Sequence, residues 1–106
     1  MKISFDFDST LAEERIQRLA AKFLRDGHEL WITTSRVNDG RWDWNREVFM
    51  VAEMFNIPRE RIVFTDGADK WLFLKNIDIH FDDDIVEIER IEQNLTTCVG
   101  VCILDP

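Results

Sequence analysis

Short apolar runs alternate along the chain with longer amphipathic stretches, and this alternation predicts a parallel β-sheet whose strands are joined by crossover helices. The apolar runs predict five strands, at residues 1–7, 30–32, 62–64, 77–81 and 98–104. Between them, apolar residues recur at the spacing of one helix face, at residues 12–23, 44–55, 71–75 and 85–95. We therefore expect an α/β fold in which helices separate the strands of one sheet.

Several residues predict where the helices begin and end. Thr10 and Glu13 have the spacing of a capping box at the start of the first helix, and residues 26–27 (Asp-Gly) end it. The second helix must stop before Pro58, because the residue that precedes a proline disfavours helical geometry. Asp66 follows the third strand, and we expect it to cap the next helix.

Length and charge limit the classes of protein to consider. The chain has 106 residues, 45% of them hydrophobic, which suits a single domain over residues 1–106. Asp and Glu number 21 against 13 Lys and Arg, so the net charge is −8. Phosphate groups would repel such a chain, which disfavours non-specific binding to nucleic acid. A nucleotide substrate is compatible with this charge if metal ions and a few local cations offset it.

The cysteines and the hydropathy pattern predict the compartment. No apolar run is long enough to cross a bilayer, and the first residues lead into a strand without a basic leader. Cys98 and Cys102 lie in one apolar segment, on one face of the predicted strand and too far apart to bridge. Buried free thiols fit a reducing compartment, so we expect a cytoplasmic protein with no membrane contact.

Polar residues gather where the predicted strands end. In open parallel sheets, ligands bind beyond the carboxyl ends of the strands, so these residues should share one edge of the sheet. They are Asp6 and Asp8 after the first strand, Thr34 after the second, Asp66 and Lys70 after the third, and Asp82, Asp83 and Asp84 after the fourth.

Crowded carboxylates repel one another and need a cation, and oxygen ligands together with a phosphate favour Mg²⁺. An ion held by Asp6 and Asp83 would leave room for a phosphate. One aspartate could then attack phosphorus, while Asp8 serves as the acid that protonates the leaving oxygen. Thr34 and Lys70 are placed to hold the phosphoryl group, with Thr33 and Lys75 as the competing assignments.

Four segments together resemble the motifs of the haloacid dehalogenase-like phosphohydrolases. Residues 6–10 (DFDST) follow an apolar strand and resemble the DxDx(T/V) signature. Residues 30–36 are similar to the second motif, an apolar strand that ends in Thr or Ser. Lys70, in residues 66–70, is similar to the third motif, and residues 79–84 are similar to the acidic fourth motif. The motifs occur in the family's order and cover essentially the whole chain.

The resemblance implies a fold and specific roles. The family's core is a three-layer α/β/α sandwich around a Rossmann-like sheet with strand order 5-4-1-2-3. Asp6 would be the nucleophile and a metal ligand, and Asp8 would be the acid/base and bind Mg²⁺ through its backbone carbonyl. Thr34 and Lys70 would hold the phosphoryl group.

For the metal, the resemblance implies that Asp83 binds directly and Asp82 through water, although the register leaves Asp83 and Asp84 as the alternative pair. Ser9 stands where the family most often has glycine. There is no room for a cap domain between the first two motifs, so a capless, open site is expected. In this family such a core works on large substrates or takes a lid from another subunit, here in a homo-oligomer or from a partner.

The loop over residues 36–46 leaves the same edge of the sheet and is rich in arginine and tryptophan. One interpretation makes Trp42 or Trp44 a stacking platform for a base, with Arg41 or Arg46 holding a further phosphate. The other buries Trp44 in the helix and leaves the arginines in ion pairs. The predicted substrate-binding residues are Ser9, Ser35, Arg36 and Trp42, whereas His28 and His80 are predicted to be structural.

The sequence therefore predicts a Mg²⁺-dependent phosphatase that works through an aspartyl-phosphate on Asp6. A phosphorylated substrate, either a nucleotide or a nucleic-acid end, fits the loop over residues 36–46. Two alternatives from other classes remain, a receiver-like phosphorylation module and a non-catalytic Mg²⁺-binding module. In receiver-like modules the second acid pair does not follow the lysine, as it does here.

Overall fold

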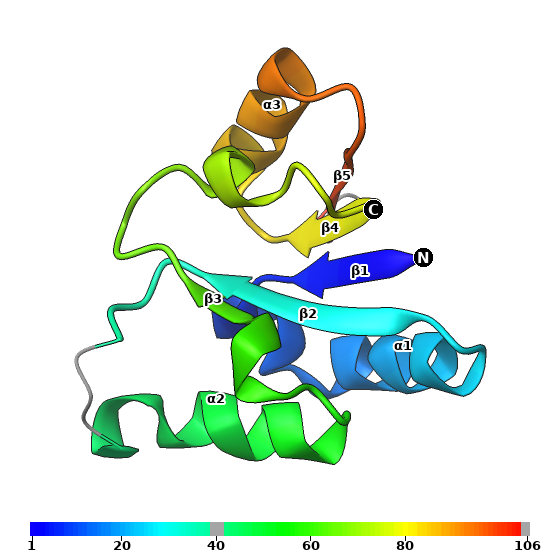
Figure 1. Cartoon of the computed structure of the whole chain (residues 1–106), viewed down its shortest axis with the longest axis vertical. Coiled ribbons are helices and arrows are strands. Elements are labelled where there is room, and N and C mark those ends of the chain that lie inside the picture. Colours follow the sequence, from blue (N-terminus) through cyan, green and yellow to red (C-terminus); the bar gives the residue numbers. More distant parts are fainter. Residues whose placement is uncertain (39–41, 105–106) are drawn as a thin grey trace.

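The computed structural model describes residues 1–38 and 42–104, and within them five parallel strands form one sheet (Figure 1). The strands are β1 (Lys2–Phe5), β2 (Glu29–Thr34), β3 (Ile62–Phe64), β4 (Ile79–Asp82) and β5 (Val99–Cys102). Their order across the sheet is β3-β2-β1-β4-β5, which reads 5-4-1-2-3 from the β5 edge. The predicted α/β class and parallel five-stranded sheet are confirmed.

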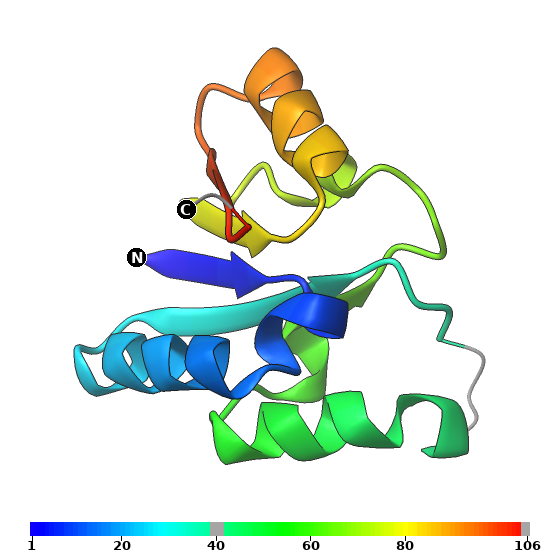
Figure 2. The same cartoon turned by 180° about the vertical axis from the view of Figure 1, so that it is seen from behind.

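Helices lie on both sides of this sheet. They are α1 (Glu14–Arg25), α2 (Trp42–Met54) and α3 (Ile85–Asn94), with short turns η1 (Phe7–Leu11), η2 (Arg59–Arg61) and η3 (Lys70–Phe73). Figure 1 shows α1 and α2 below the sheet and α3 with η3 above it, and the view from behind agrees (Figure 2). No helix in the described part of the chain is long and apolar enough to cross a membrane.

Alternation along the strands divides the core into two clusters. Ile3 and Phe5 of β1 lie in the larger cluster, together with apolar residues of α1 and α2, and the Phe5 ring stacks on that of Phe81 at 5.2 Å. Trp31 of β2 packs instead against the smaller cluster on the side of α3. Ser4, between Ile3 and Phe5, is fully buried on that second side, where it contributes a polar group.

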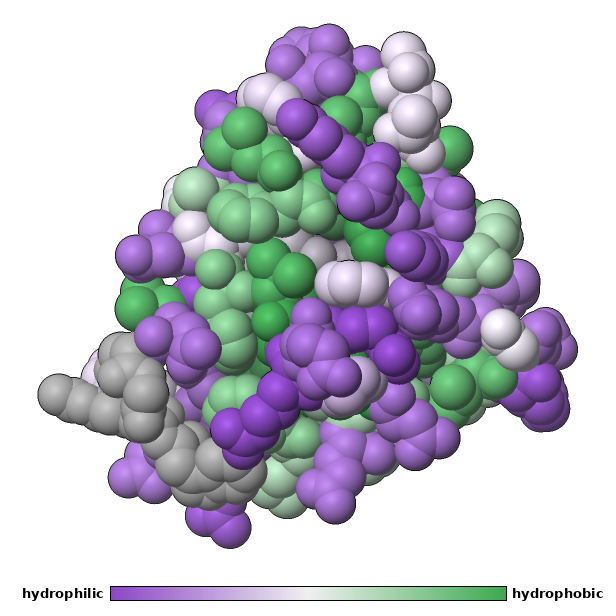
Figure 3. Space-filling model, in the orientation of Figure 1, coloured by the Kyte–Doolittle hydropathy of each residue, from purple (hydrophilic) through white to green (hydrophobic). Residues whose placement is uncertain are grey.

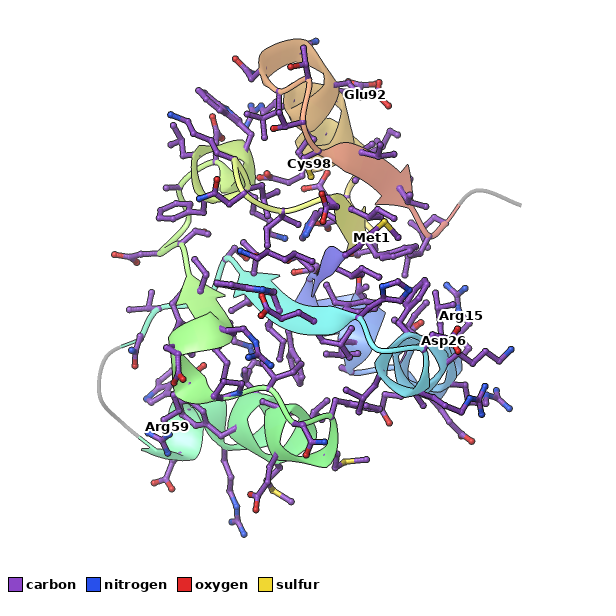
Figure 4. The ribbon with its side chains drawn as sticks, turned by 45° about the vertical axis from the view of Figure 1, so that its right-hand side comes forward. Met1, Arg15, Asp26, Arg59, Glu92 and Cys98 are labelled. Atoms are coloured by element: carbon purple, nitrogen blue, oxygen red, sulfur yellow. The ribbon has the colours of Figure 1, made fainter. Side chains whose placement is uncertain are left out.

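The smaller cluster holds Cys98, which precedes β5 and is labelled in Figure 4. Cys98 and Cys102 are both free, as the sequence predicts. Burial raises the pKa of the Cys98 thiol to about 11, so it stays protonated and unreactive at neutral pH. Arg15, also labelled in Figure 4, lies on α1 and donates to the carbonyl of Ile103 at 3.3 Å, which links α1 to the end of β5.

Two predicted helix caps are wrong. The residue before α1 is Glu13, and its side chain makes no capping bond. Thr10, the predicted cap, donates its hydroxyl to the carboxylate of Asp6 instead. Asp66 lies in a turn with φ +53°, and the residue that precedes η3 is Asp69. The predicted end of the first helix is confirmed, since Gly27 follows α1 with φ +88°, a conformation that favours glycine.

The smaller cluster is the part of the core that holds α3, so it offers a direct test of the fold. Ile91→Ala removes a side chain that is 0% exposed and should lower the free energy of unfolding by about 2–5 kcal/mol. Ile85→Ala, on the same helix at a site that is 49% exposed, should cost far less. Urea unfolding of both variants measures the difference, and equal losses would contradict the packing described.

Candidate functional site

Parallel pairing of β1 with β4 brings three carboxylates together at the carboxyl edge of the sheet. Phe5 pairs with Phe81, and the backbone N–H of Asp6 donates to the carbonyl of Phe81 at 2.9 Å. One carboxylate oxygen from each of Asp6, Asp82 and Asp83 lies within 4.8 Å of the others. Two sequence-distant segments thus meet as the strand-end rule predicts.

Lys70 reaches this cluster from η3. Its Nζ donates to Oδ1 of Asp6 at 2.8 Å and to Oδ2 of Asp82 at 2.7 Å, and the residue is 3% exposed. The backbone N–H of Lys70 donates to Glu87 at 3.1 Å, which ties η3 to α3. Lys75, the competing assignment, is exposed. The structure therefore brings Lys70, and not Lys75, to the acid cluster.

A buried chain of polar groups continues from this cluster across the sheet. Oδ2 of Asp82 lies 2.9 Å from Nε2 of His80, and Nδ1 of His80 lies 3.0 Å from the Ser4 hydroxyl. The Ser4 hydroxyl in turn lies 2.7 Å from that of Thr33. These groups are at most 1% exposed, so each must find its partner within the protein.

The protonation state of His80 sets the direction of this chain. Burial lowers the pKa of His80, so the ring is neutral and offers one donor and one acceptor. The carboxylate of Asp82 can only accept, which assigns the proton to Nε2 and makes Nδ1 the acceptor for Ser4. Ser4 then accepts from Thr33. His80, which the sequence predicts to be structural, is fully buried, and its hydrogen bond orients the carboxylate of Asp82.

The pKa values of the two buried carboxyls of the cluster are shifted in opposite directions. Burial, with the negative charge of Asp82, raises the pKa of Asp6 to about 7 although Lys70 opposes this. Burial also disfavours ionisation of Asp82, but His80 and Lys70 bring the pKa of that carboxyl down to about 2. Asp6 is thus the carboxyl whose charge the protein compensates less, so a further cation would stabilise its ionised form.

Hydrogen bonds also distinguish the three acids after β4. Both oxygens of Asp82 accept bonds from protein groups, Oδ2 from Lys70 and His80, and Oδ1 from the N–H of Asp84. Asp84 caps α3 by accepting from the N–H of Val86 at 2.9 Å. The cluster therefore contains Asp82 and Asp83 but not Asp84, so the first of the two acid pairs that the sequence left open is the one that lies beside Asp6.

Thr10 links the two strands' acids. Its hydroxyl is 3.3 Å from Oδ2 of Asp6 and 3.4 Å from Oδ1 of Asp83, within reach of either as a donor. Thr10 is fully buried, because η1 closes with wide turns in which Leu11 N–H donates to Asp6 and Ala12 N–H to Phe7. Thr10 is the threonine of the segment DFDST, and this motif was the sequence signal for its place beside the acids. The capping-box interpretation instead predicted that Thr10 caps the first helix.

Asp8 lies outside the cluster and pairs with Arg36. The guanidinium binds both carboxylate oxygens of Asp8, at 2.9 Å from Nε and 2.7 Å from Nη2, and lies 5.1 Å from the centre of the Phe7 ring. The hydrogen bonds of Arg36 hold the pKa of Asp8 below its usual value. The structure therefore joins Asp8 to Arg36 as a bidentate ion pair at the rim of the site.

The remaining predicted residues lie around this rim. Ser9 is exposed and has φ +59°, in the left-handed region that favours glycine, the family's usual residue there. Ser35 is exposed, and its carbonyl accepts from the N–H of Gly67 at 3.0 Å. Thr34 is buried, with its hydroxyl accepting from the N–H of Arg36 at 3.3 Å. Trp42 begins α2, and its side chain lies outside the described part of the structure.

The exposure of Trp44 contradicts one of the two interpretations of the loop over residues 36–46. The residue is 64% exposed, so the prediction that it is buried at the start of the helix is wrong. The prediction of ion-paired arginines holds for Arg36, which contacts Asp8 and, at 3.3 Å, Glu47. Arg41 lies outside the described residues. A pocket of about 650 Å³ opens here, lined by Arg36, Val37, Trp44, Asn45 and Glu47.

Comparison of the chain with family models, with curated proteins and with solved structures found no match. The class of the molecule is therefore described by its own fold and site. It is a parallel α/β protein with a cluster of three carboxylates, two buried and one half-buried, beside one lysine at the carboxyl edge of its sheet.

The opposite pKa shifts of Asp6 and Asp82 predict opposite pH dependences in the metal-free protein. Because the folded-state pKa of Asp6 is about 7 and the ordinary pKa of an aspartate is 3.8, the folded state holds, between these pH values, a proton that the unfolded state has lost. Stability should therefore fall as pH rises between these values. Asp6→Asn removes that cost. The melting temperature of the variant minus that of wild type should therefore rise by about 4 °C or more as the pH increases from 4.5 to 7.5.

Asp82→Asn is the matched control. The pKa of Asp82 is lowered to about 2, so its ionised form stabilises the fold above pH 3.8 and loses this effect as pH falls toward 2. This variant should melt below wild type at pH 7.5. Thermal melts in a chelator measure both variants, and a parallel response of the two would contradict the assigned electrostatics.

Proposed function

We propose that the protein is a Mg²⁺-dependent phosphomonoesterase of the haloacid dehalogenase-like class, with Asp6 as the nucleophile. The observation that supports this most is the buried carboxylate of Asp6, held by Lys70 at 2.8 Å beside a second acidic strand end. Helices on both sides of the sheet fit the sandwich architecture of that class. The resemblance of four sequence motifs to those of this class also supports the proposal, because the side chains of the site come from these motifs.

The donors of the site fit a hard divalent cation. All three carboxylates of the cluster offer oxygen, and Asp6 and Asp83 are the two that the protein leaves less occupied by hydrogen bonds. They would hold Mg²⁺ directly with the backbone carbonyl of Asp8, and Asp82 would contact it through water. Bound there, Mg²⁺ would offset the repulsion between the Asp6 carboxylate and an anionic phosphate.

The first half-reaction forms an aspartyl-phosphate. An oxygen of Asp6 attacks phosphorus, the bond from phosphorus to the ester oxygen breaks, and Asp8 gives its proton to that leaving oxygen. Lys70, paired to Asp6 and Asp82, balances the negative charge that gathers there. The hydroxyl of Thr34, buried at the end of β2, would donate to the transferred group.

The second half-reaction releases phosphate. Water attacks phosphorus, Asp8 takes the proton of that water, and the bond between phosphorus and Asp6 breaks. The ion pair with Arg36 holds Asp8 in the carboxylate form that this step requires. A bound phosphate ester adds negative charge near Asp8, which raises the pKa of its carboxyl and favours the protonated form needed in the first half.

The open edge of the sheet and the apolar surface beside it bear on the substrate class and on a lid. The open edge admits a nucleotide or a nucleic-acid end as the phosphorylated substrate. Apolar side chains gather over η3 in Figure 3, where Leu72 and Phe73 are 50% and 44% exposed, and Ile85 and Val86 are exposed at the start of α3. This apolar surface flanks the segments that carry Lys70 and Asp83, and it suits contact with a lid from another subunit.

One observation favours a second candidate. Arg36 occupies both oxygens of Asp8, so if this pair persisted with substrate bound, only a phosphodonor whose leaving group needs no proton would phosphorylate Asp6, and phosphate would not be released. The protein would then act as a phosphorylation module. A long-lived phospho-Asp6 formed from a small phosphodonor, with negligible phosphate release, distinguishes this candidate from the phosphatase.

Asp6→Asn tests the nucleophile. The variant should lose phosphate release from a panel of phosphate esters by about a thousandfold or more, because the amide of asparagine cannot form the acyl phosphate. In wild type, a single turnover in ¹⁸O-water should place the label in the released phosphate. Asp66→Asn, in an exposed turn, is the control and should retain activity. Full activity in Asp6→Asn would end the assignment.

Asp83→Asn tests the metal ligands. Mg²⁺ at a hundredfold excess over its Kd should stabilise wild type by about 2.7 kcal/mol, measured as a rise in melting temperature. Asp83→Asn should abolish most of this gain because it removes a charged ligand. Asp84→Asn should keep it, since asparagine still caps α3. An unchanged Mg²⁺ response in Asp83→Asn would contradict the proposed ligand set.

A further inference from the structure

The pocket beside Arg36 is unused by the chemistry described above. Its volume is about 650 Å³, within the range of ligand pockets in proteins. The other described cavity, of about 540 Å³, is lined by Pro58, Arg61 and neighbours at the start of β3, away from the carboxyl edge. Only the first adjoins the acid cluster's rim, because its lining residue Arg36 is bonded to Asp8.

Internal hydrogen bonds hold the walls of this pocket in place. Nδ2 of Asn45, a residue that is 1% exposed, donates to the carbonyl of Val37 at 2.9 Å and ties the loop after β2 to α2. Nη1 of Arg36 donates to the carbonyl of Trp44 at 3.0 Å. The pocket is therefore formed before any ligand enters, with Trp44 presented on its wall at 64% exposure.

The position of Asp8 decides which part of a substrate would enter. In the proposed mechanism Asp8 gives its proton to the leaving oxygen, so the leaving group lies on the side of Asp8. Arg36 contacts Asp8 at 2.7 Å and also lines the pocket, which places the pocket on that same side. The alcohol that departs from phosphorus is thus the part of the substrate that the pocket would hold.

Charge decides the chemical class of that alcohol. Arg36 is the only cation among the described residues that line the pocket, and its donors are taken by Asp8, Glu47 and the carbonyl of Trp44. Glu47 adds a negative charge to the wall. Among the described lining residues, no cation is therefore free for a second phosphate, whereas the indole of Trp44 and the apolar Val37 suit a flat, uncharged ring.

We propose that this pocket binds the base of a mononucleotide whose phosphate is cleaved at Asp6, with Trp44 as the stacking residue. The inference rests on the proposed phosphatase function and narrows its substrate class. A nucleic-acid end fits less well, because each further phosphate would approach Glu47 and a chain of net charge −8. Trp44 is then a specificity residue for the leaving nucleoside.

The test compares two esters that differ only in the base. Adenosine 5′-monophosphate and ribose 5-phosphate share the phosphate and the sugar, so the ratio of their kcat/KM values isolates the pocket. Stacking on one aromatic side chain should give wild type a ratio of about ten or more in favour of the nucleotide. A 5′-phosphorylated oligonucleotide should be hydrolysed less efficiently than the mononucleotide.

Variants assign that ratio to Trp44. Trp44→Ala should bring it close to one, and Trp44→Phe should restore most of it, because phenylalanine keeps an aromatic face. Met54→Ala is the matched control, on the same helix, equally exposed at 64% and outside the pocket, and should keep the wild-type ratio. A wild-type ratio near one, an unchanged ratio in Trp44→Ala, or a preference for the oligonucleotide would overturn the proposal.

Binding of adenosine separates this proposal from the proposed function. Adenosine carries no phosphate, so calorimetry with it probes the pocket without turnover. Wild type and Asp6→Asn should bind it alike, and Trp44→Ala at least tenfold more weakly. Trp44-dependent binding without hydrolysis of any ester would leave the pocket standing and remove the phosphatase. Hydrolysis without such binding would remove the pocket and leave the phosphatase.

Discussion

The ammonium of Lys70 between the carboxylates of Asp6 and Asp82 is the interaction on which the rest of the structure depends. It joins the ends of β1 and β4 to η3, and through η3 to α3. Two buried carboxylates this close would repel one another strongly without it. The same bond therefore holds the α3 side of the molecule onto the sheet and keeps the acid cluster in place.

The cluster concentrates negative charge in the protein interior, which costs stability. One lysine serves two buried acids, and the excess negative charge is expressed as the raised pKa of Asp6. His80 and its hydroxyl partners on β1 and β2 satisfy Asp82 and leave Asp6 as the carboxyl whose charge is less compensated. A protein selected for stability alone would replace such a group with an apolar residue. Retaining it is consistent with binding a cation and an anionic substrate.

The predictions that agree with the structure rest on local sequence pattern, whereas those that fail depend on long-range packing. The third strand lies where the apolar run at 62–64 predicts, and the helix ends near 26–27 and before Pro58 are as predicted, because these signals act within a few residues. The capping box at Thr10 is wrong because its hydroxyl faces two carboxylates, that of Asp6 four residues earlier and that of Asp83, which follows β4 and comes near only through the sheet. Trp44 is exposed although helical spacing favours a buried position.

The sequence by itself determined the class of fold and the shared edge of the strand-end residues, since hydrophobic period fixes the elements and parallel pairing aligns their carboxyl ends. Only the tertiary structure decided which acid takes which partner: Asp82 with His80, Asp84 as a helix cap, Asp8 with Arg36. Those choices depend on distances between segments far apart in the chain and on burial, which changes the energy of a charge. Neither quantity is carried by the order of residues along a single strand or helix.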